Sequence, residues 1–287
     1  MAFVVGIVLN GGFVIAESVY GLAANSLALL ADAAHNLGDV LGLALSGGAI
    51  WLSRSLPTRT RSYGYGRTTI LASLVNAVVL LVSVGAIGIE AIQRAIHPQP
   101  VTQDIVMAVA ALGILINGGT ALMFMAGRAG DLNIRGAFLH MAADAGISLG
   151  VVISALVIGA TGWFWLDPAT SLGIALLIGI ATWGLLKDSL ALALDAVPPG
   201  VDPHAIENHL RTLPQVTEVH DLHIWGLSTQ ETALTVHLVR KVETLDDGFL
   251  AVLCRDLKER FGIGHATIQI EQGDQAHPCG LAPDHVI

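Results

Sequence analysis

The chain has 287 residues, of which 53% are hydrophobic and only 13% are charged, about half the charged fraction of an ordinary soluble domain. It carries 14 Lys and Arg against 23 Asp and Glu, so nucleic-acid binding is disfavoured because no excess of basic side chains is present to meet phosphates. Two cysteines and an apolar composition exclude a secreted disulfide scaffold and a disordered chain, and they favour a membrane protein.

The charge is unevenly spread along the chain. Residues 1–196 hold 8 basic and 10 acidic side chains, whereas residues 197–287 hold 6 basic and 13 acidic side chains and eight of the eleven histidines. We therefore expect an α-helical membrane domain over residues 1–196. A small soluble α+β domain is expected over residues 197–273, followed by a flexible C-terminal tail over residues 274–287.

Six stretches are apolar enough to cross a bilayer as helices, which takes ~20 residues each. They are residues 2–23, 28–53, 69–95, 104–126, 137–161 and 168–192. Seven Lys and Arg lie in the loops after the second and fourth stretches or at the end of the sixth, whereas the opposite side holds only Arg94. Because basic residues favour the cytoplasmic side, both termini are predicted to lie in the cytoplasm.

Ionisable side chains recur inside two of these stretches, where burial in lipid makes them functional candidates. His35 and Asp39 in the second stretch, and His140 and Asp144 in the fifth, are each one helical turn apart on one face. Together they offer two imidazoles and two carboxylates, a tetrahedral set suited to Zn²⁺ and open to related transition metals. The alternative is that each pair forms a private hydrogen bond and binds no metal.

Three further charges lie within the membrane stretches. Asp32 lies one turn before His35, where it either supports the four metal ligands or relays protons. The alternative is that Asp32 lies in water near the outer surface of the membrane. Glu17 and Glu90 are expected near helix ends or in a wet cleft. The sequence contains no His-Glu-x-x-His motif, P-loop or Gly-x-Ser-x-Gly elbow, so it does not indicate an enzyme.

The soluble part predicts the element order α-β-β-α-β. Asp202 followed by Pro203 marks the start of a helix that runs to about residue 213. The remaining elements are strands at 216–227 and 232–240, a helix at 246–261 and a strand at 266–271. This order predicts a three-stranded sheet with its helices packed on one face.

Four side chains of the soluble part lie on or beside three different strands, namely His220, His237, His265 and Glu271. Neighbouring strands bring side chains together, so these residues are candidates for a second metal site. An acidic, histidine-rich surface that is merely solvated explains the same residues equally well. His223 alternates to the other face from His220. Cys254 is expected in the core, and Cys279 either binds metal or lies in a disordered end.

The chain resembles the cation diffusion facilitator family, in particular its zinc-transporting branch. The resemblance rests on the stretch Ser26 to Asp39, on Tyr63-Gly-Tyr-Gly-Arg67, on His140-x-x-x-Asp144, and on two soluble segments, Val219–Trp225 and Thr267–Glu271. It covers essentially the whole chain.

The resemblance implies a homodimeric Zn²⁺/H⁺ antiporter with a metallochaperone-like cytoplasmic domain, located in a bacterial cytoplasmic (inner) membrane. It assigns the transport site to His35, Asp39, His140 and Asp144. It assigns a regulatory metal site to His220, His237, His265 and Glu271. It also implies an ion pair between Arg67 and Asp195 that links the third and sixth helices near the dimer interface. Zn²⁺ is then both cargo and regulator, and Cd²⁺ is expected to be carried as well.

The chain also departs from the family pattern. Residues 57–67 contain neither Asp nor His, so we expect no metal site in that loop, and residues 127–136 contain no histidine. Two other functions stay open, namely a metal-sensing membrane protein that moves no ions and a passive metal channel. Four strong facing ligands disfavour the channel, because conduction needs weak or multiple sites.

Overall fold

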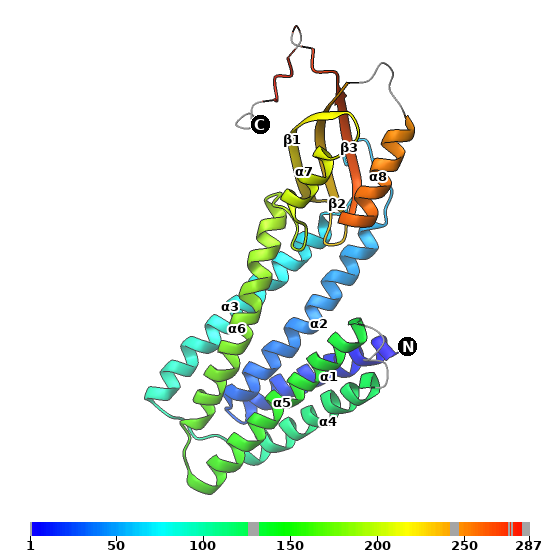
Figure 1. The fold of residues 1–287 in the computed structure, drawn as a ribbon. Helices are drawn as coiled ribbons and strands as arrows, with labels where there is room; N and C mark the ends of the chain where they lie inside the picture. Colours follow the sequence, from blue (N-terminus) through cyan, green and yellow to red (C-terminus); the bar gives the residue numbers. More distant parts are fainter. Residues whose placement is uncertain (1, 126–131, 242–246, 275, 277, 283–287) are drawn as a thin grey trace. The chain divides into compact units, whose positions relative to one another are not determined.

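The computed structural model describes residues 2–125, 132–241, 247–274, 276 and 278–282. Within this described part, six long helices come first in chain order (Figure 1). They are α1 (Ala2–Ala23), α2 (Leu27–Ser53), α3 (Thr68–Ile96), α4 (Gln103–Met125), α5 (Leu132–Thr161) and α6 (Leu166–Ala193). Each closely matches an expected stretch, although α5 begins earlier than residue 137. Arg128, which contributed to the predicted orientation, lies outside the described residues.

Four helices in the described part are long and apolar enough to span a membrane. They are α3, α4 over Gln103–Met123, α5 over Phe138–Thr161, and α6. The acidic, histidine and amide side chains of α2 lower its hydropathy, which explains why α2 is not among them. The helical membrane domain is therefore confirmed, whereas the count of six spanning helices stays a prediction.

The chain divides into two compact units, one of Met1–Leu45 with Val75–Leu185 and the other of Ser46–Leu74 with Leu186–Ile287. The core of the first unit draws on five of the long helices, and its buried residues include Phe13, Leu29, Val109, Val151 and Ile174. Many of its other members are alanines, which allow helices to approach closely. This packing holds α2 against α5, the two helices that carry the paired His and Asp residues.

The start of α2 is fixed by a buried carboxylate on α6. Asp167 is 2% exposed, and its Oδ2 accepts a hydrogen bond of 2.7 Å from the backbone N–H of Leu27. Its Oδ1 accepts a hydrogen bond from the Ser26 hydroxyl. Unpaired backbone N–H groups and the positive end of the helix dipole make a helix start a favourable place for a carboxylate. Asp167 thereby sets the position of α2 and of the ligands along it.

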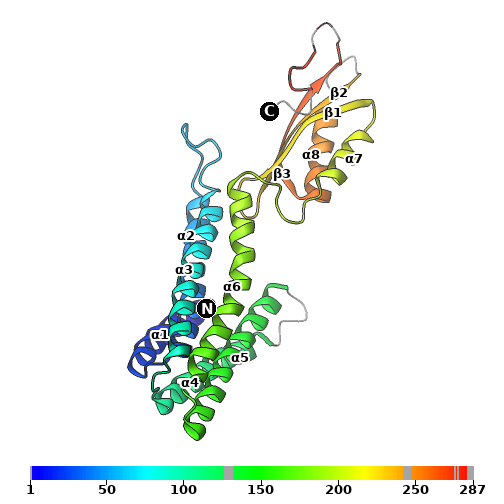
Figure 2. The same ribbon diagram turned by 90° about the vertical axis from the view of Figure 1, so that its left-hand side faces the viewer.

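The second unit contains a small sheet with two helices. Its elements are α7 (Pro203–Arg211), β1 (Val216–Gly226), β2 (Thr232–Arg240), α8 (Asp247–Phe261) and β3 (Ile263–Glu271). The strand order is β1-β2-β3, with β1 antiparallel and β3 parallel to β2. Both helices cover one face of the sheet (Figure 2). The expected α-β-β-α-β domain is confirmed, and β3 begins three residues earlier than predicted.

Side-chain alternation divides this sheet into two faces. Leu234, Val236 and Leu238 of β2 belong to one buried core with Ile206 of α7 and Leu253 of α8. Since side chains alternate along a strand, the residues between them lie on the face away from the helices. The prediction of a buried Cys254 is wrong, because this cysteine lies on the solvent side of α8 and is exposed. Residues 275, 277 and 283–287 of the expected tail lie outside the described residues.

Candidate metal sites

The two His–Asp motifs meet between α2 and α5. Nε2 of His35 lies 3.2 Å from Oδ1 of Asp144, and Nε2 of His140 lies 3.3 Å from Oδ2 of Asp39. The contacts within each motif are longer, at 3.8 Å for His35 with Asp39 and 3.7 Å for His140 with Asp144. Each imidazole therefore lies nearer the carboxylate of the other helix, which favours one shared set over two private pairs.

The donor set has features that favour a cation. His35, Asp39 and Asp144 each offer a ligand atom within 4.8 Å of the others, and His140 adjoins both carboxylates. Asp144 is only 1% exposed, and Oδ2 of each of the two carboxylates is buried with a ring nitrogen of His140 beside it, at 3.3 Å for Asp39 and 3.7 Å for Asp144. Burying a carboxylate is unfavourable unless it is paired or coordinates a metal, so a divalent ion would compensate both charges.

A cavity gives access to this set. It has a volume of about 770 Å³ and is lined by His35, His140 and Asp144. Its other lining residues are mainly small or apolar and come from α5 and α6. A cavity of this size holds many water molecules, each of which occupies ~30 Å³ in the liquid, so a hydrated metal ion fits.

A second buried network lies beside this set. Glu17 and Asp32 are fully buried, and the Asn36 amide donates to Oε2 of Glu17 at 3.1 Å and to Oδ1 of Asp32 at 3.4 Å. The Ser148 hydroxyl donates to Oδ2 of Asp32 at 2.9 Å, which links α2 to α5 one turn from Asp144. The expectation of a wet cleft around Glu17 is therefore wrong, as is the alternative of a water-exposed Asp32. Glu90 is partly exposed and forms an ion pair with Arg94.

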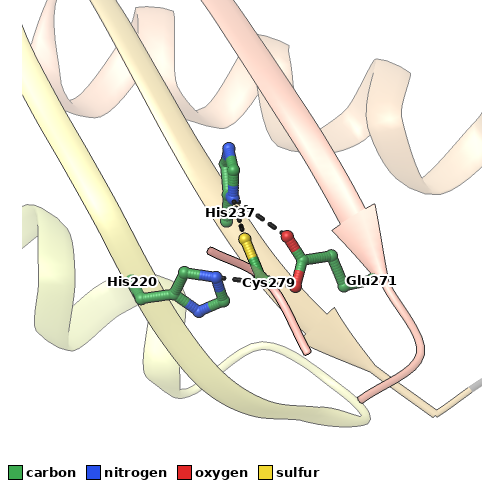
Figure 3. A group of neighbouring side chains, drawn as sticks. All are labelled: His220, His237, Glu271 and Cys279. Atoms are coloured by element: carbon green, nitrogen blue, oxygen red, sulfur yellow. Dashed lines mark hydrogen bonds and ion pairs between the residues drawn. The ribbon is translucent and has the colours of Figure 1, made fainter. Parts of the chain in front are cut away.

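The face of the small sheet away from its helices carries a second cluster (Figure 3). His220 of β1 pairs directly with His237 of β2, and Glu271 lies at the end of β3 on the same face. Nδ1 of His237 is 2.9 Å from Oε1 of Glu271, and Nε2 of His220 is 3.5 Å from Oε2 of the same carboxylate. The structure thus brings together three of the four predicted residues.

His265 does not join this cluster. It pairs with Ala233, four residues before His237 on β2, which places it roughly 13 Å away at ~3.3 Å per residue. Its ring instead contacts Tyr63, with centroids 5.5 Å apart in an edge-on arrangement. Alternation correctly indicates the face on which His265 lies, but it does not indicate the height along the strand.

Two residues outside the predicted set of four complete the cluster. The Cys279 thiol lies 3.5 Å from Nδ1 of His237, and Oδ2 of Asp221 lies 3.4 Å from Nε2 of the same ring. Asp221 reaches this position because β1 is irregular between His220 and His223, where Asp221 has a positive φ of 50°. The irregularity is not visible in the sequence, whereas the cysteine near the histidines was a usable signal.

The charges of the cluster affect one another. Burial opposes ionisation of Glu271, but hydrogen bonds from Cys279 and Gln269 and the nearby imidazoles of His220 and His237 outweigh it. Together they hold the pKa of the Glu271 carboxyl below its usual value. A hydrogen bond involving the backbone of Leu281 favours the Cys279 thiolate, but burial and Glu271 outweigh it and raise the pKa of the thiol. Glu271 is therefore ionised at neutral pH, whereas the Cys279 thiol stays protonated unless a positive charge stabilises its thiolate.

Arg67, directly before α3, and Asp195, two residues after the end of α6, form an ion pair in the second unit. Both side chains are about half exposed, so the pair contributes little to stability by itself. It joins the ends of two helices next to the small sheet.

Residues 3–192 match the family described as cation efflux transmembrane domain, and residues 198–273 match cation efflux protein, cytoplasmic domain. The chain belongs to the cation efflux family. The resemblance to zinc-transporting cation diffusion facilitators is thereby confirmed. A metal-cation efflux protein of the membrane is a transporter and not an enzyme, and its cytoplasmic domain is of the type that forms dimers.

Three relatives illustrate the similarity. Cation efflux system protein CzcD of Alcaligenes sp. (strain CT14) is 37% identical over 97% of this chain and 90% of its own length. Zinc transporter ZitB of Escherichia coli (strain K12) is 37% identical over 94% of this chain and 85% of its own length. The cadmium, cobalt and zinc/H(+)-K(+) antiporter of Bacillus subtilis (strain 168) is 31% identical over 93% of this chain and 87% of its own length.

Proposed function

We propose that this chain exports Zn²⁺ from the bacterial cytoplasm across the inner membrane in exchange for protons. In this proposal six helices span the membrane and both termini lie in the cytoplasm. The observation that carries the proposal is the shared donor set of His35, Asp39, His140 and Asp144, in which each imidazole contacts the carboxylate of the other helix. Relatives named as a zinc transporter and as a cadmium, cobalt and zinc antiporter support the choice of metal and suggest that Cd²⁺ is carried too.

The donor set itself supplies the coupling to protons. Zn²⁺ binds neutral imidazole and ionised carboxylate, so metal binding releases protons and protonation releases the metal. Free imidazole titrates near pH ~6.5, within the range that a membrane pH gradient covers. If the set faces the two sides of the membrane in turn, protonation of its ligands on the acidic side expels the metal ion, and the return of the protonated set carries those protons inward, so no ATP site is needed.

Asp32 has a supporting role in this proposal. Its hydrogen bond with Ser148 joins α2 to α5 beside the ligand set, one turn from Asp144. Asn36 connects Asp32 to Glu17 of α1, so the ligand-bearing turn of α2 is held from two sides. The network therefore keeps the two halves of the transport site in register, and its carboxylates are available to relay protons.

The cytoplasmic part is proposed to tune transport and not to perform it. We assign the transport domain to residues 1–196, the cytoplasmic domain to residues 197–273 and a C-terminal tail to residues 274–287. The protein acts as a homodimer through this domain, in line with the family matched by residues 198–273. Zn²⁺ bound by the cluster around His237 is the regulatory signal, and the Arg67–Asp195 pair lies at the junction with the helices.

Flux measurements in liposomes test the transport function. The purified protein is reconstituted with an imposed pH gradient, and zinc movement is followed with a trapped fluorescent indicator. The wild-type protein should accumulate zinc in response to the gradient. Asp39→Ala and Asp144→Ala should show no flux above empty liposomes, because each loses both a ligand and charge compensation. Asp104→Ala, which removes an exposed carboxylate from the first turn of α4, is the matched control and should behave like the wild type.

The same measurement separates the other two functions. A metal sensor gives no zinc flux in any of these conditions, and a passive channel gives flux that ignores the pH gradient. Normal flux in Asp144→Ala would show that the shared donor set is not the transport site.

A further inference from the structure

The described segment around Cys279 returns to the sheet and places its thiol inside the histidine cluster. One ligand atom from each of His220, His237, Glu271 and Cys279 lies within 4.8 Å of all the others. These atoms come from three neighbouring strands and from the segment after β3, and Figure 3 shows the four side chains pointing toward one another. A metal ion at their centre would be surrounded from four directions.

The separations fit a tetrahedral zinc site. Zn–N and Zn–S bonds of 2.0–2.3 Å place tetrahedral ligand atoms roughly 3.3–3.8 Å apart. The cluster has contacts of 3.5 Å between Cys279 and His237 and 3.5 Å between His220 and Glu271. The contact of 2.9 Å between His237 and Glu271 is shorter, and it is a direct hydrogen-bonding contact that a metal ion would replace. Small side-chain movements are therefore enough to admit the ion.

The state of His220 also points to a missing ligand. Its side chain is 4% exposed, and neither ring nitrogen has a hydrogen-bond partner. Buried polar atoms are nearly always paired, because an unpaired one loses its hydration without compensation. The nearest carboxylate oxygens, on Glu271 and Glu218, lie at 3.5 and 3.6 Å. A metal ion at the cluster would satisfy Nε2 of this ring.

His237 is oriented as a metal ligand is. Nδ1 faces Glu271 and Cys279, while Nε2 faces the carboxylate of Asp221. In protein metal sites the second ring nitrogen of a ligating histidine commonly donates to a carboxylate, which fixes the ring orientation and raises the basicity of the ligand. Asp221 thus holds Nδ1 of His237 toward the centre of the cluster.

We propose that His220, His237, Glu271 and Cys279 form a closed four-ligand site for Zn²⁺ or Cd²⁺, and that metal binding fastens the segment around Cys279 onto the sheet. On binding, the Cys279 thiol releases its proton to solvent and ligates as a thiolate. The inference rests on the proposed regulatory role of this domain and changes its ligand set, because Cys279 takes the place expected for His265. A thiolate makes this site softer than the nitrogen and oxygen set of the membrane helices.

Thiol protection in the full-length protein tests the inference. The reduced protein carries Asp144→Ala so that the membrane site does not contribute, and maleimide labelling of its two cysteines is followed by mass spectrometry. Zn²⁺ should slow labelling of Cys279 at least about tenfold, because a metal-bound thiolate is a poor nucleophile. Labelling of Cys254, which is exposed on α8, should not change and serves as the internal control.

Ligand variants sharpen the test. His237→Ala and Glu271→Gln should abolish the protection of Cys279, whereas His265→Ala, on the same face of the sheet, should retain it. Titration with Cd²⁺ gives a second readout, since a cadmium–thiolate bond absorbs in the ultraviolet. This absorption should appear in Cys254→Ser and be missing in Cys279→Ser.

Unchanged labelling of Cys279 with Zn²⁺, or loss of protection in His265→Ala to the same extent as in His237→Ala, would overturn the inference. Its failure is distinguishable from failure of the transport proposal. Proton-driven zinc flux without Cys279 protection refutes only the four-ligand site, whereas protection without flux refutes only transport.

Discussion

His35 and His140 supply both nitrogen donors of the proposed transport site, and the carboxylates supply its oxygen donors. Zn²⁺ has no ligand-field preference and accepts a mixed tetrahedral set, whereas Mn²⁺ and Mg²⁺ favour six oxygen ligands. His35 is the more buried imidazole, at 17% exposure against 44% for His140. The identity of residue 35 should therefore influence which metals the site accepts.

His35→Asp should change metal selectivity more than zinc turnover. The substitution leaves one imidazole and three carboxylates, a harder and more anionic set that favours metals with oxygen ligands. We expect the variant to lose discrimination against Mn²⁺, measured as competition with zinc flux in liposomes. An unchanged Zn/Cd/Mn competition profile would instead mean that helix packing sets the size of the site and that the ligand identity matters little.

Zinc binding at the transport site should weaken as the pH falls through the titration range of imidazole. Protons compete with the metal for both imidazoles, because an imidazole must lose its proton before it can bind Zn²⁺. Each proton that zinc has to displace lowers the apparent zinc affinity by up to about tenfold for each pH unit. Calorimetry on the full-length protein with Cys279→Ser and His237→Ala isolates the membrane site. An affinity that does not change between mildly acidic and neutral pH would contradict coupling through the ligands.

At the scale of single elements, α2 depends on a contact that is remote in sequence. The backbone N–H groups of Leu27 and Ala28 donate to Asp167 of α6, and the Ser26 hydroxyl does so as well. Because α2 carries His35 and Asp39, a shift at its start moves half of the transport site.

Asp167→Ala should destabilise the protein by about 1–2 kcal/mol, the usual cost of removing a helix N-cap, and should reduce zinc flux. Unfolding in detergent micelles measures the first effect and liposome flux the second. Asp104→Ala, at the exposed start of α4, should change neither. Equal stability of the two variants would show that the Asp167 contacts do not hold α2.

Helix and strand order followed from sequence because apolar periodicity and the cap at Asp202 are local properties. The meeting of the paired motifs on α2 and α5 also followed, since spacing places each pair on one face. The position of His265 along its strand and the irregular backbone at Asp221 could not be predicted, because they depend on strand register. The sequence offered metal binding as one role for Cys279, but it did not show that this residue lies against the sheet, because that contact is non-local. Burial of Glu17 was missed for the same reason, since its partner Asn36 lies on another helix.

At the scale of the whole molecule, the proposed regulation requires a signal from the sheet to reach the membrane helices. The second unit joins the loop before α3 to the turn between β1 and β2. The backbone N–H of Thr229 donates to the Thr69 hydroxyl at 3.0 Å, and His265 contacts Tyr63. Gly66 packs so closely that a Cβ would lie 2.9 Å from the Leu227 carbonyl oxygen. These contacts provide a direct mechanical connection between sheet and helix ends.

Gly66→Ala should therefore uncouple the cytoplasmic domain from transport while leaving both metal sites intact. The added methyl group meets a backbone oxygen that cannot move without shifting the turn, so the loop and the sheet must separate. We expect basal zinc flux within about twofold of wild type, because neither site loses a ligand. In the proposed regulation cytoplasmic zinc changes the flux through the cluster around His237, and Gly66→Ala should lose this response, as His237→Ala should. Unlike His237→Ala, however, Gly66→Ala should keep zinc protection of Cys279.

Gly48→Ala, where a Cβ meets nothing within 4 Å, is the matched control. A normal zinc response in Gly66→Ala would show that the signal takes another route.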